Sequence, residues 1–304
     1  MFEVIAQAGI LMVCGVLWRV YAPLGLSGDV LRNSLTSLVY VLLLPALVLV
    51  VLWRAPLSFD AVWVGLLAAS GVLFALGVAW LWFRRRAPSS AVLGTLLLAS
   101  AFPNATYLGL PVLEASLGEW ARSIAIQYDL FACTPLLLSL GIVLAQRYGG
   151  VSAGGNPLRQ LLRVPPLWAA IVGVCLNLLG VPLPSILAGS LDMLAAGVIP
   201  LMLFSLGLAL RWGDSWQGKW SLLLPVVAIQ MLLTPLLVWG LAQGTSLEGA
   251  VLTAVVLEAA MPTMVLGIVL CDRYRLDTGL YAMAVTLTTV LSMVFLPLWF
   301  VLLQ

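Results

Sequence analysis

Two prolines inside apolar segments stand at equivalent places in the two halves of this 304-residue chain. Pro103 lies in the run LLLASAFPNATYLGLPVLEASLG and is followed by Asn104, and Pro262 lies in VVLEAAMPTMVLGIVLCDRY. Because proline has no N–H and its ring strikes the carbonyl four residues earlier, each proline should release a backbone carbonyl, that of Ala99 or Glu258, and break its helix. Matching breaks in a duplicated membrane chain are typical of a transporter's substrate site.

These breaks predict a site for a carboxylate. The half-helix that begins after each break points its positive end toward the bilayer midplane, which favours an anion. Asn104 adds an amide that can both donate and accept. The alternative is that both breaks are ordinary kinks, such as those expected at Pro45 and Pro225. The predicted substrate-binding residues are Pro103, Asn104, Ala105, Thr106, Pro262 and Thr263.

Two carboxyl groups lie well inside apolar segments. Glu258 is one turn before Pro262, and Asp129 follows Gln127 and Tyr128. A charge near the bilayer centre costs roughly 2.5–3.5 kcal/mol and usually marks an ion or substrate path. Since a carboxylate repels an anionic substrate unless a proton or cation neutralises it, we expect coupling or gating here, with a hydrogen bond to a neighbouring helix as the alternative. The residues predicted for coupling or gating are Ala99, Gln127, Tyr128, Asp129, Glu258 and Met261.

Composition places these residues in a membrane. Hydrophobic residues make up 63% of the chain and charged residues 9%, far from the quarter or so that is charged in a soluble domain. Segments long enough to cross a bilayer recur along the whole length, with no room for a soluble domain between them. We predict an all-α polytopic membrane protein, residues 1–304 forming one membrane domain. The ten predicted spans are 3–20, 31–52, 59–83, 91–116, 121–146, 166–180, 186–210, 219–242, 249–271 and 279–303.

The spans divide into two halves of similar layout, residues 1–148 and 164–304, joined by a glycine-rich cytoplasmic connector at 149–163. In each half a proline interrupts the second span, a tryptophan closes it and a proline breaks the fourth. These landmarks are Pro45 and Pro200, Trp53 and Trp212, and Pro103 and Pro262. Because five spans is an odd number, the halves should be inverted repeats that open alternately to each side. Coincidence among 17 prolines is the alternative.

Charge placement predicts the orientation. Of the 14 basic residues, only Arg54 and Arg122 fall on the side that carries the termini. The positive-inside rule therefore puts both termini outside the cytoplasm, in a plasma membrane of the bacterial inner-membrane type. Glu3 stands where a signal peptide has its basic region, so we expect no cleaved signal peptide. The net charge of +2 reflects this topology and gives no case for nucleic acid.

Residues needed for catalysis are scarce. The chain has no histidine, and its four cysteines lack paired spacing. It has no Gly-Lys-Ser/Thr phosphate loop, which disfavours transport driven by ATP. We therefore predict that the protein is not an enzyme and has no organic cofactor and no metal centre.

Two motifs resemble a known family. FPNATYLGLP (102–111) resembles the fourth-helix signature of the auxin efflux carrier family, which includes the plant PIN carriers and many bacterial transporters, and AAMPTMVLGIVLCDRY (259–274) resembles its ninth helix. This resemblance implies an elevator-like fold, in which helices 1, 2, 6 and 7 form an often dimeric scaffold and helices 3–5 and 8–10 form a transport domain. Helices 4 and 9 would cross beside the substrate, with Pro103, Asn104 and Pro262 at the crossover.

The chain departs from the PIN carriers in two respects. Thr263 stands where they have glutamine, which puts auxin in doubt as the substrate, and their long central loop is reduced to about Gln146–Arg163. A fainter resemblance links Glu258 and Met261 to the Glu-x-x-Met run of the bile-acid sodium symporters, where glutamate and freed carbonyls ligate sodium. Sodium coupling at Glu258, proton coupling and uncoupled facilitation therefore all stay open.

The predicted function is secondary active transport of a small organic anion, such as a mono- or dicarboxylate, by alternating access. We expect the substrate at the crossover of helices 4 and 9, lipid around the chain, and a homodimer through the scaffold helices. Na⁺ or H⁺ is the expected coupling ion if there is one. The alternatives are a channel for ions or solutes, or a ligand sensor on a transporter fold.

Overall fold

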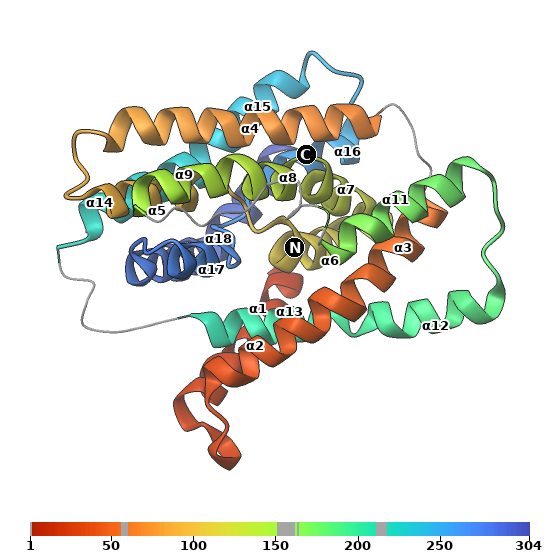
Figure 1. The fold of residues 1–304 in the computed structure, drawn as a ribbon. Helices are drawn as coiled ribbons and strands as arrows, with labels where there is room; N and C mark the ends of the chain where they lie inside the picture. The colour runs from red at the N-terminus through yellow and green to blue at the C-terminus, as the bar shows by residue number, and fades with distance from the viewer. Residues whose placement is uncertain (1, 56–59, 151–161, 163, 211–217) are drawn as a thin grey trace.

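The computed structural model describes residues 2–55, 60–150, 162, 164–210 and 218–304 (Figure 1). Within these ranges the regular elements are helices, apart from one isolated β-bridge between Pro103 and Thr263. The landmark Trp212 and most of the predicted connector 149–163 lie outside the described residues. The described chain is therefore all-helical, as the sequence predicts.

Among the described residues, six helical segments are long and apolar enough to cross a membrane. They are Gly28–Arg54, Asp60–Phe83, Ala121–Gly149, Ser185–Ala209, Trp220–Ala242 and Thr278–Leu302. Their helices are α2 (Gly28–Leu38), α3 (Leu44–Arg54), α4 (Asp60–Phe83), α7 (Ala121–Tyr128), α8 (Thr134–Leu136), α9 (Ile142–Gly149), α12 (Ser185–Ala196), α13 (Val198–Ala209), α14 (Trp220–Ala228), α15 (Thr234–Ala242) and α18 (Thr278–Leu302).

The remaining helices are also largely apolar. They are α1 (Phe2–Tyr21), α5 (Ser90–Ala101), α6 (Leu110–Leu117), α11 (Pro165–Leu178), α16 (Gly249–Ala259), α17 (Gly267–Arg273) and the short η1 (Pro23–Gly25). The observed ends lie within one helical turn of the predicted segments, because the apolar runs end where charged residues, glycine or proline begin.

π-Helical turns precede four of the prolines inside the spans, Pro45, Pro111, Pro135 and Pro235. In a π-turn the backbone N–H donates to the carbonyl five residues earlier. This arrangement relieves the clash between the proline ring and the carbonyl four residues before it. In the second span, for example, the N–H of Leu44 donates to the Val39 carbonyl just before Pro45. The π-turns that end two residues before a proline are η2 (Val39–Leu43), η3 (Ala105–Gly109), η4 (Asp129–Cys133) and η7 (Ile229–Leu233); a further one, η5 (Leu137–Gly141), leads into α9.

Two segments are broken more deeply. α5 ends at Ala101, the chain runs extended through Phe102, and helix resumes only at Ala105 with η3 and α6. α16 ends at Ala259, and helix resumes at Gly267 with α17. Both breaks fall at the prolines that the sequence singles out.

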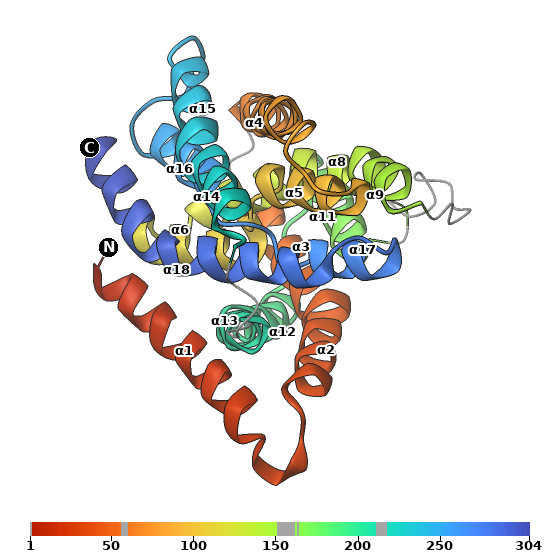
Figure 2. The same cartoon turned by 90° about the vertical axis from the view of Figure 1, so that its left-hand side faces the viewer.

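The helices form two groups by their packing. α1 and α2 pack against α13, and α3 packs against α11 and α12. The other group contains α4 to α9 and α14 to α18, which pack mainly among themselves. Figure 2 shows α1, α2, α12 and α13 on one side of α18, with α4, α5 and α15 on the other. Within the first group Gly15 approaches the carbonyl of Phe204 and Gly207 approaches that of Met12, so a side chain at either glycine would prevent the contact.

Candidate functional site

The two breaks meet and hydrogen-bond to each other. The backbone N–H of Asn104 donates to the Pro262 carbonyl at 2.7 Å, and the N–H of Met264 donates to the Phe102 carbonyl at 2.9 Å. These bonds flank the antiparallel bridge between Pro103 and Thr263. The broken segments therefore cross at their prolines, as the family resemblance implies.

The carbonyls released by the prolines are satisfied inside the protein. The hydroxyl of Thr263 donates to the Ala99 carbonyl at 2.8 Å, so the second half of the chain caps the break in the first. The Glu258 carbonyl accepts from the N–H of Met261 at 3.2 Å. The Met261 carbonyl in turn accepts from the Gln230 amide at 3.0 Å. These contacts make Thr263, Ala99 and Met261 supports of the crossover in this conformation.

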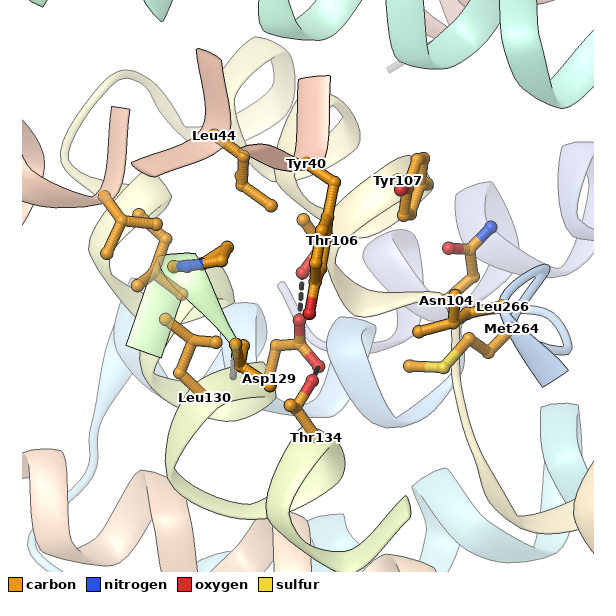
Figure 3. A pocket seen from close by; sticks show the side chains of 14 residues that line it. Tyr40, Leu44, Asn104, Thr106, Tyr107, Asp129, Leu130, Thr134, Met264 and Leu266 are labelled. Carbon is orange, nitrogen blue, oxygen red and sulfur yellow. Dashed lines mark hydrogen bonds between the residues drawn. The ribbon is translucent and has the colours of Figure 1, made fainter. Parts of the chain in front are cut away.

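A cavity lies beside the crossover (Figure 3). Its volume of about 30 Å³ is room for roughly two water molecules. Asn104 lines it and is only 1% exposed, and neither atom of its amide hydrogen-bonds to another described residue. A buried polar group without a partner costs about 1–3 kcal/mol. Asn104 is therefore a strong candidate for ligand recognition.

A carboxyl group and two tyrosines form the polar wall of this cavity. The Asp129 carboxylate accepts from the hydroxyl of Thr134 at 2.9 Å and from that of Thr106. Tyr40 and Tyr107 lie close by, and the Tyr107 hydroxyl is buried without a partner among the described residues (Figure 3). The polar residues of the wall therefore come from three elements: the segment broken at Pro103, the second span and the fifth span.

The rest of the wall is apolar and comes from both packing groups. The residues that complete it are Leu44, Val48, Ile126, Leu130, Val164, Pro166, Met264 and Leu266. The helix α11 begins at this wall, at Pro165. Its other end is held beside the end of α3, where the Asn177 amide donates to the carbonyls of Trp53 and Ala55 at 2.8 and 2.7 Å. The cavity therefore lies on the boundary between the two groups of helices.

Glu258 lies apart from the cavity wall. Its side chain is fully buried, and neither carboxyl oxygen has a partner among the described residues. The carboxyl presses against Gly109, where a Cβ would collide with both oxygens. Glu258 and Asp129 are near enough to interact electrostatically. The glutamate of one broken segment therefore packs on the glycine of the other.

The structure brings together only some of the predicted site residues. Asn104, Thr106 and Asp129 line one cavity, although the sequence assigned Asp129 to coupling and the other two to the substrate. Buried but outside that wall are Ala99, Pro103, Ala105, Gln127, Tyr128, Glu258, Met261, Pro262 and Thr263. Sequence reasoning missed Tyr40, Tyr107 and Thr134. Tyr107 lies inside the recognised motif, so its position there was a usable signal.

An all-helical apolar chain with two broken segments that cross beside a buried polar cavity has the architecture of a membrane transporter. Comparison with known proteins agrees. The model of the family described as membrane transport protein matches residues 2–300. The chain belongs to this family, which contains the auxin efflux carriers, and so stands among transporters and not among enzymes.

Relatives extend from archaea to plants. An uncharacterised transporter of Methanothermobacter thermautotrophicus is 32% identical over 304 residues, which covers 99% of this chain and 98% of that protein. An uncharacterised transporter of Methanocaldococcus jannaschii is 29% identical over 68% of this chain and 67% of its own length. A probable auxin efflux carrier component 1b of Oryza sativa is 25% identical over 48% of this chain and 27% of its own.

Proposed function

We propose that the protein is a secondary transporter of small organic anions, with the substrate carboxylate bound at the crossover of the two broken segments. The observation that carries this proposal is the buried amide of Asn104, which has no hydrogen-bond partner among the described residues and lines a cavity between two groups of helices. The half-helix that starts at Ala105 adds the positive end of a helix dipole at the same place.

The carboxyl of Asp129 lies in the same wall, so an anion can bind beside it only if one of the two negative charges is neutralised. Two carboxylates in one small cavity repel each other unless a proton or a cation intervenes. We therefore propose Asp129 as the group that couples transport to H⁺ or Na⁺, with the buried Glu258 as a second carrier of a proton or cation. An unpaired buried carboxylate is costly, which supports a neutralising partner for Glu258 as well.

The two packing groups support a mechanism of alternating access. We propose that α1–α3 and α11–α13 form a fixed scaffold, and that α4–α9 with α14–α18 carry the substrate across the membrane. The similar order of spans and breaks in residues 1–148 and 164–304 supports an arrangement of ten spans in two inverted repeats. We further propose that the scaffold forms a homodimer, and that the termini lie outside the cytoplasm of a bacterial-type inner membrane.

Substitution of Asn104 tests this proposal. Purified protein in liposomes is expected to show saturable carboxylate uptake and counterflow, which a channel does not show. Asn104→Ala should abolish that saturable uptake, or raise KM at least about tenfold, the effect of losing roughly 1.4 kcal/mol of binding. Gln243→Ala is the matched control, because it removes an exposed amide directly after the end of α15 that does not line the cavity. Unchanged uptake by Asn104→Ala with a normal melting temperature contradicts the assignment.

A further inference from the structure

An apolar groove lies between α4 and the helical segment that begins with α14, on the side of the molecule that faces away from α1 and α2 (Figure 2). Its volume is about 310 Å³, and every residue of its wall is hydrophobic. Trp82, Leu224 and Leu233 in this wall are 44%, 55% and 41% exposed, so the groove opens outward. The residues that line it are Val78, Trp82, Leu224, Pro225, Ala228, Ile229 and Leu233.

The groove exists because the two helical segments diverge. α4 packs closely against η7 and α15 but much less against α14. At the closed end a Cβ at Gly71 would lie 3.1 Å from the side chain of Val238. At the open end Trp82 stands opposite α14, where Pro225 and Ala228 have compact side chains that do not fill the gap. The gap therefore widens toward the end of α4.

The depth of the groove matches one leaflet of a bilayer. Leu224 and Leu233 are nine residues apart, which is about 14 Å along a helix. The hydrocarbon core is about 30 Å thick, so one leaflet contributes about half of that. The groove starts in the last turn of α4, which ends at Phe83, and so runs from one end of the span toward its middle. An acyl chain that enters from the membrane surface fills the same depth.

Three consecutive arginines follow the end of α4 at the mouth of the groove. Arg84, Arg85 and Arg86 are exposed, and the sequence has no acidic residue between positions 60 and 114. The Arg86 guanidinium lies 4.2 Å from the centre of the Trp82 ring and donates to the Trp82 carbonyl at 2.9 Å. Since Trp82 also lines the groove, this cation–π contact holds a positive charge directly beside the apolar wall.

The groove and the arginines together suit an amphiphile with an apolar tail and a negative head. The positive-inside rule accounts for arginines at this end of the span, but not for a hollow of one-leaflet depth beside them, nor for the stacking of Arg86 on a residue of its wall. Guanidinium groups bind phosphate oxygens through paired, charge-assisted hydrogen bonds. Anionic lipids are attracted to such basic segments at the membrane surface.

We propose that this groove is a binding site for an anionic phospholipid, with one acyl chain against Trp82, Leu224 and Leu233 and the phosphate at Arg84–Arg86. The site lies outside the cavity beside Asn104 and shares no residue with it. The proposal therefore does not depend on the substrate that the protein carries.

The test compares two lipids with the same acyl chains, dioleoyl phosphatidylglycerol and dioleoyl phosphatidylcholine, added to the purified chain in detergent. The anionic lipid should raise the melting temperature more at equal concentration. With Arg84→Gln, Arg85→Gln and Arg86→Gln combined, the same shift should need at least about tenfold more of it. The matched control removes three exposed arginines that the sequence places on the same side of the membrane and that do not line the groove: Arg147→Gln, Arg273→Gln and Arg275→Gln. If the first combination does not fold, Arg86→Gln alone replaces it.

A second variant tests the groove without changing the charges. Ala228→Phe fills the groove and should lower the number of anionic lipids retained in native mass spectrometry, whereas Ala196→Phe, at an exposed alanine that ends α12, should not. Equal stabilisation by the two lipids, or a preference that survives the loss of Arg84–Arg86, overturns the site. Inorganic phosphate that stabilises as well as the lipid assigns the arginines to a free anion and overturns it too. So does an Ala228→Phe chain that keeps its lipid but changes its oligomeric mass, because the groove then holds a second copy.

Discussion

At the scale of single residues, the two buried carboxyls have very different surroundings. Asp129 accepts hydrogen bonds from Thr106 and Thr134, whereas Glu258 has no partner among the described residues and rests on Gly109. Hydroxyl donors stabilise a carboxylate, and their absence disfavours one. The carboxyl of Asp129 thus has two hydroxyl partners at the cavity, whereas the carboxyl of Glu258 is buried between the two broken segments without a hydrogen-bond partner among the described residues.

The contact between Gly109 and Glu258 predicts a loss of stability on Gly109→Ala. The added methyl collides with the carboxyl of Glu258 in a fully buried place, and overpacking of this kind costs about 1–3 kcal/mol. Thermal unfolding in detergent measures it. Gly77→Ala is the control, since a Cβ there meets no atom within 4 Å and alanine favours the helix. In a Glu258→Ala background the cost should shrink, and an equal cost in both backgrounds would falsify this contact as its cause.

Asp129 predicts how transport depends on the coupling ion. Asp129→Asn keeps the size of the side chain and one of its two acceptor oxygens but removes its charge, so the anion no longer needs a neutralising partner. If Asp129 has the proposed coupling role, uptake measured at pH 6 and pH 8, with and without sodium, should lose in this variant whatever dependence on H⁺ or Na⁺ the native protein shows. Tyr40, Tyr107 and Glu258 are the other titratable groups near this carboxyl, and Glu258→Gln serves as the comparison. Unaltered ion dependence in Asp129→Asn removes Asp129 from the coupling role.

At the scale of elements, each broken segment is completed by the other. Pro103 releases the Ala99 carbonyl, and the hydroxyl that satisfies it belongs to Thr263, 164 residues away in sequence. The Thr263 N–H is itself held by the Thr288 hydroxyl at 3.1 Å. The breaks are therefore stable because they occur together, which explains why neither needs to be exposed to lipid.

This reciprocity predicts that Thr263 supports stability more than recognition. Thr263→Val removes the donor and leaves the buried Ala99 carbonyl unpaired, at a cost of about 1–3 kcal/mol in unfolding free energy. Thr263→Ser keeps the hydroxyl and should lose less. A comparison of the melting temperatures of the two variants shows whether Thr263 supports stability. Asn104→Ala is the control, because it changes the same crossover and should leave the melting temperature nearly unaltered. A Thr263→Val protein as stable as Thr263→Ser contradicts the capping role.

Much of this architecture follows from local sequence, and part of it cannot. Hydrophobic runs and charged flanks locate the helices, and Pro103 and Pro262 locate the breaks, because both effects act within a few residues. The partners at the crossover could not be read in this way, since the pairing of Thr263 with Ala99 depends on how distant segments pack. The same holds for Tyr40, an unremarkable position in an apolar run until the fold places it beside Asp129. Glu258 was predicted for coupling from its charge, but only its contact with Gly109 shows that it stands outside the cavity.

At the scale of the whole molecule, the cavity beside Asn104 and the sparse packing lie on the same boundary between the two groups of helices. α1 and α13 are joined through Gly15 and Gly207, and α3 is joined to α11 and α12, whereas few helix pairs pack extensively across the boundary. A boundary that contains a cavity and is crossed by few close contacts is one along which two groups of helices can slide. The alternative, a fixed pore along the same boundary, requires no relative motion.

A cross-link across this boundary separates the two cases. Gly9 of α1 and Met293 of α18 belong to different groups, and the Met293 methyl lies 3.4 Å from the place of a Cβ at Gly9. Joining Gly9→Cys and Met293→Cys with a short bifunctional thiol reagent should abolish carboxylate counterflow while binding, measured as thermal stabilisation by the ligand, persists. The matched control is Gly65→Cys with Phe131→Cys, because these positions lie within one group and their Cβ atoms would be 3.5 Å apart, within the range for a disulfide. Linking that pair should leave transport intact. If counterflow survives the first cross-link, the two groups of helices do not move past each other along α1 and α18. Access from both sides then has to come from movements of the side chains around the cavity beside Asn104, such as that of Tyr107.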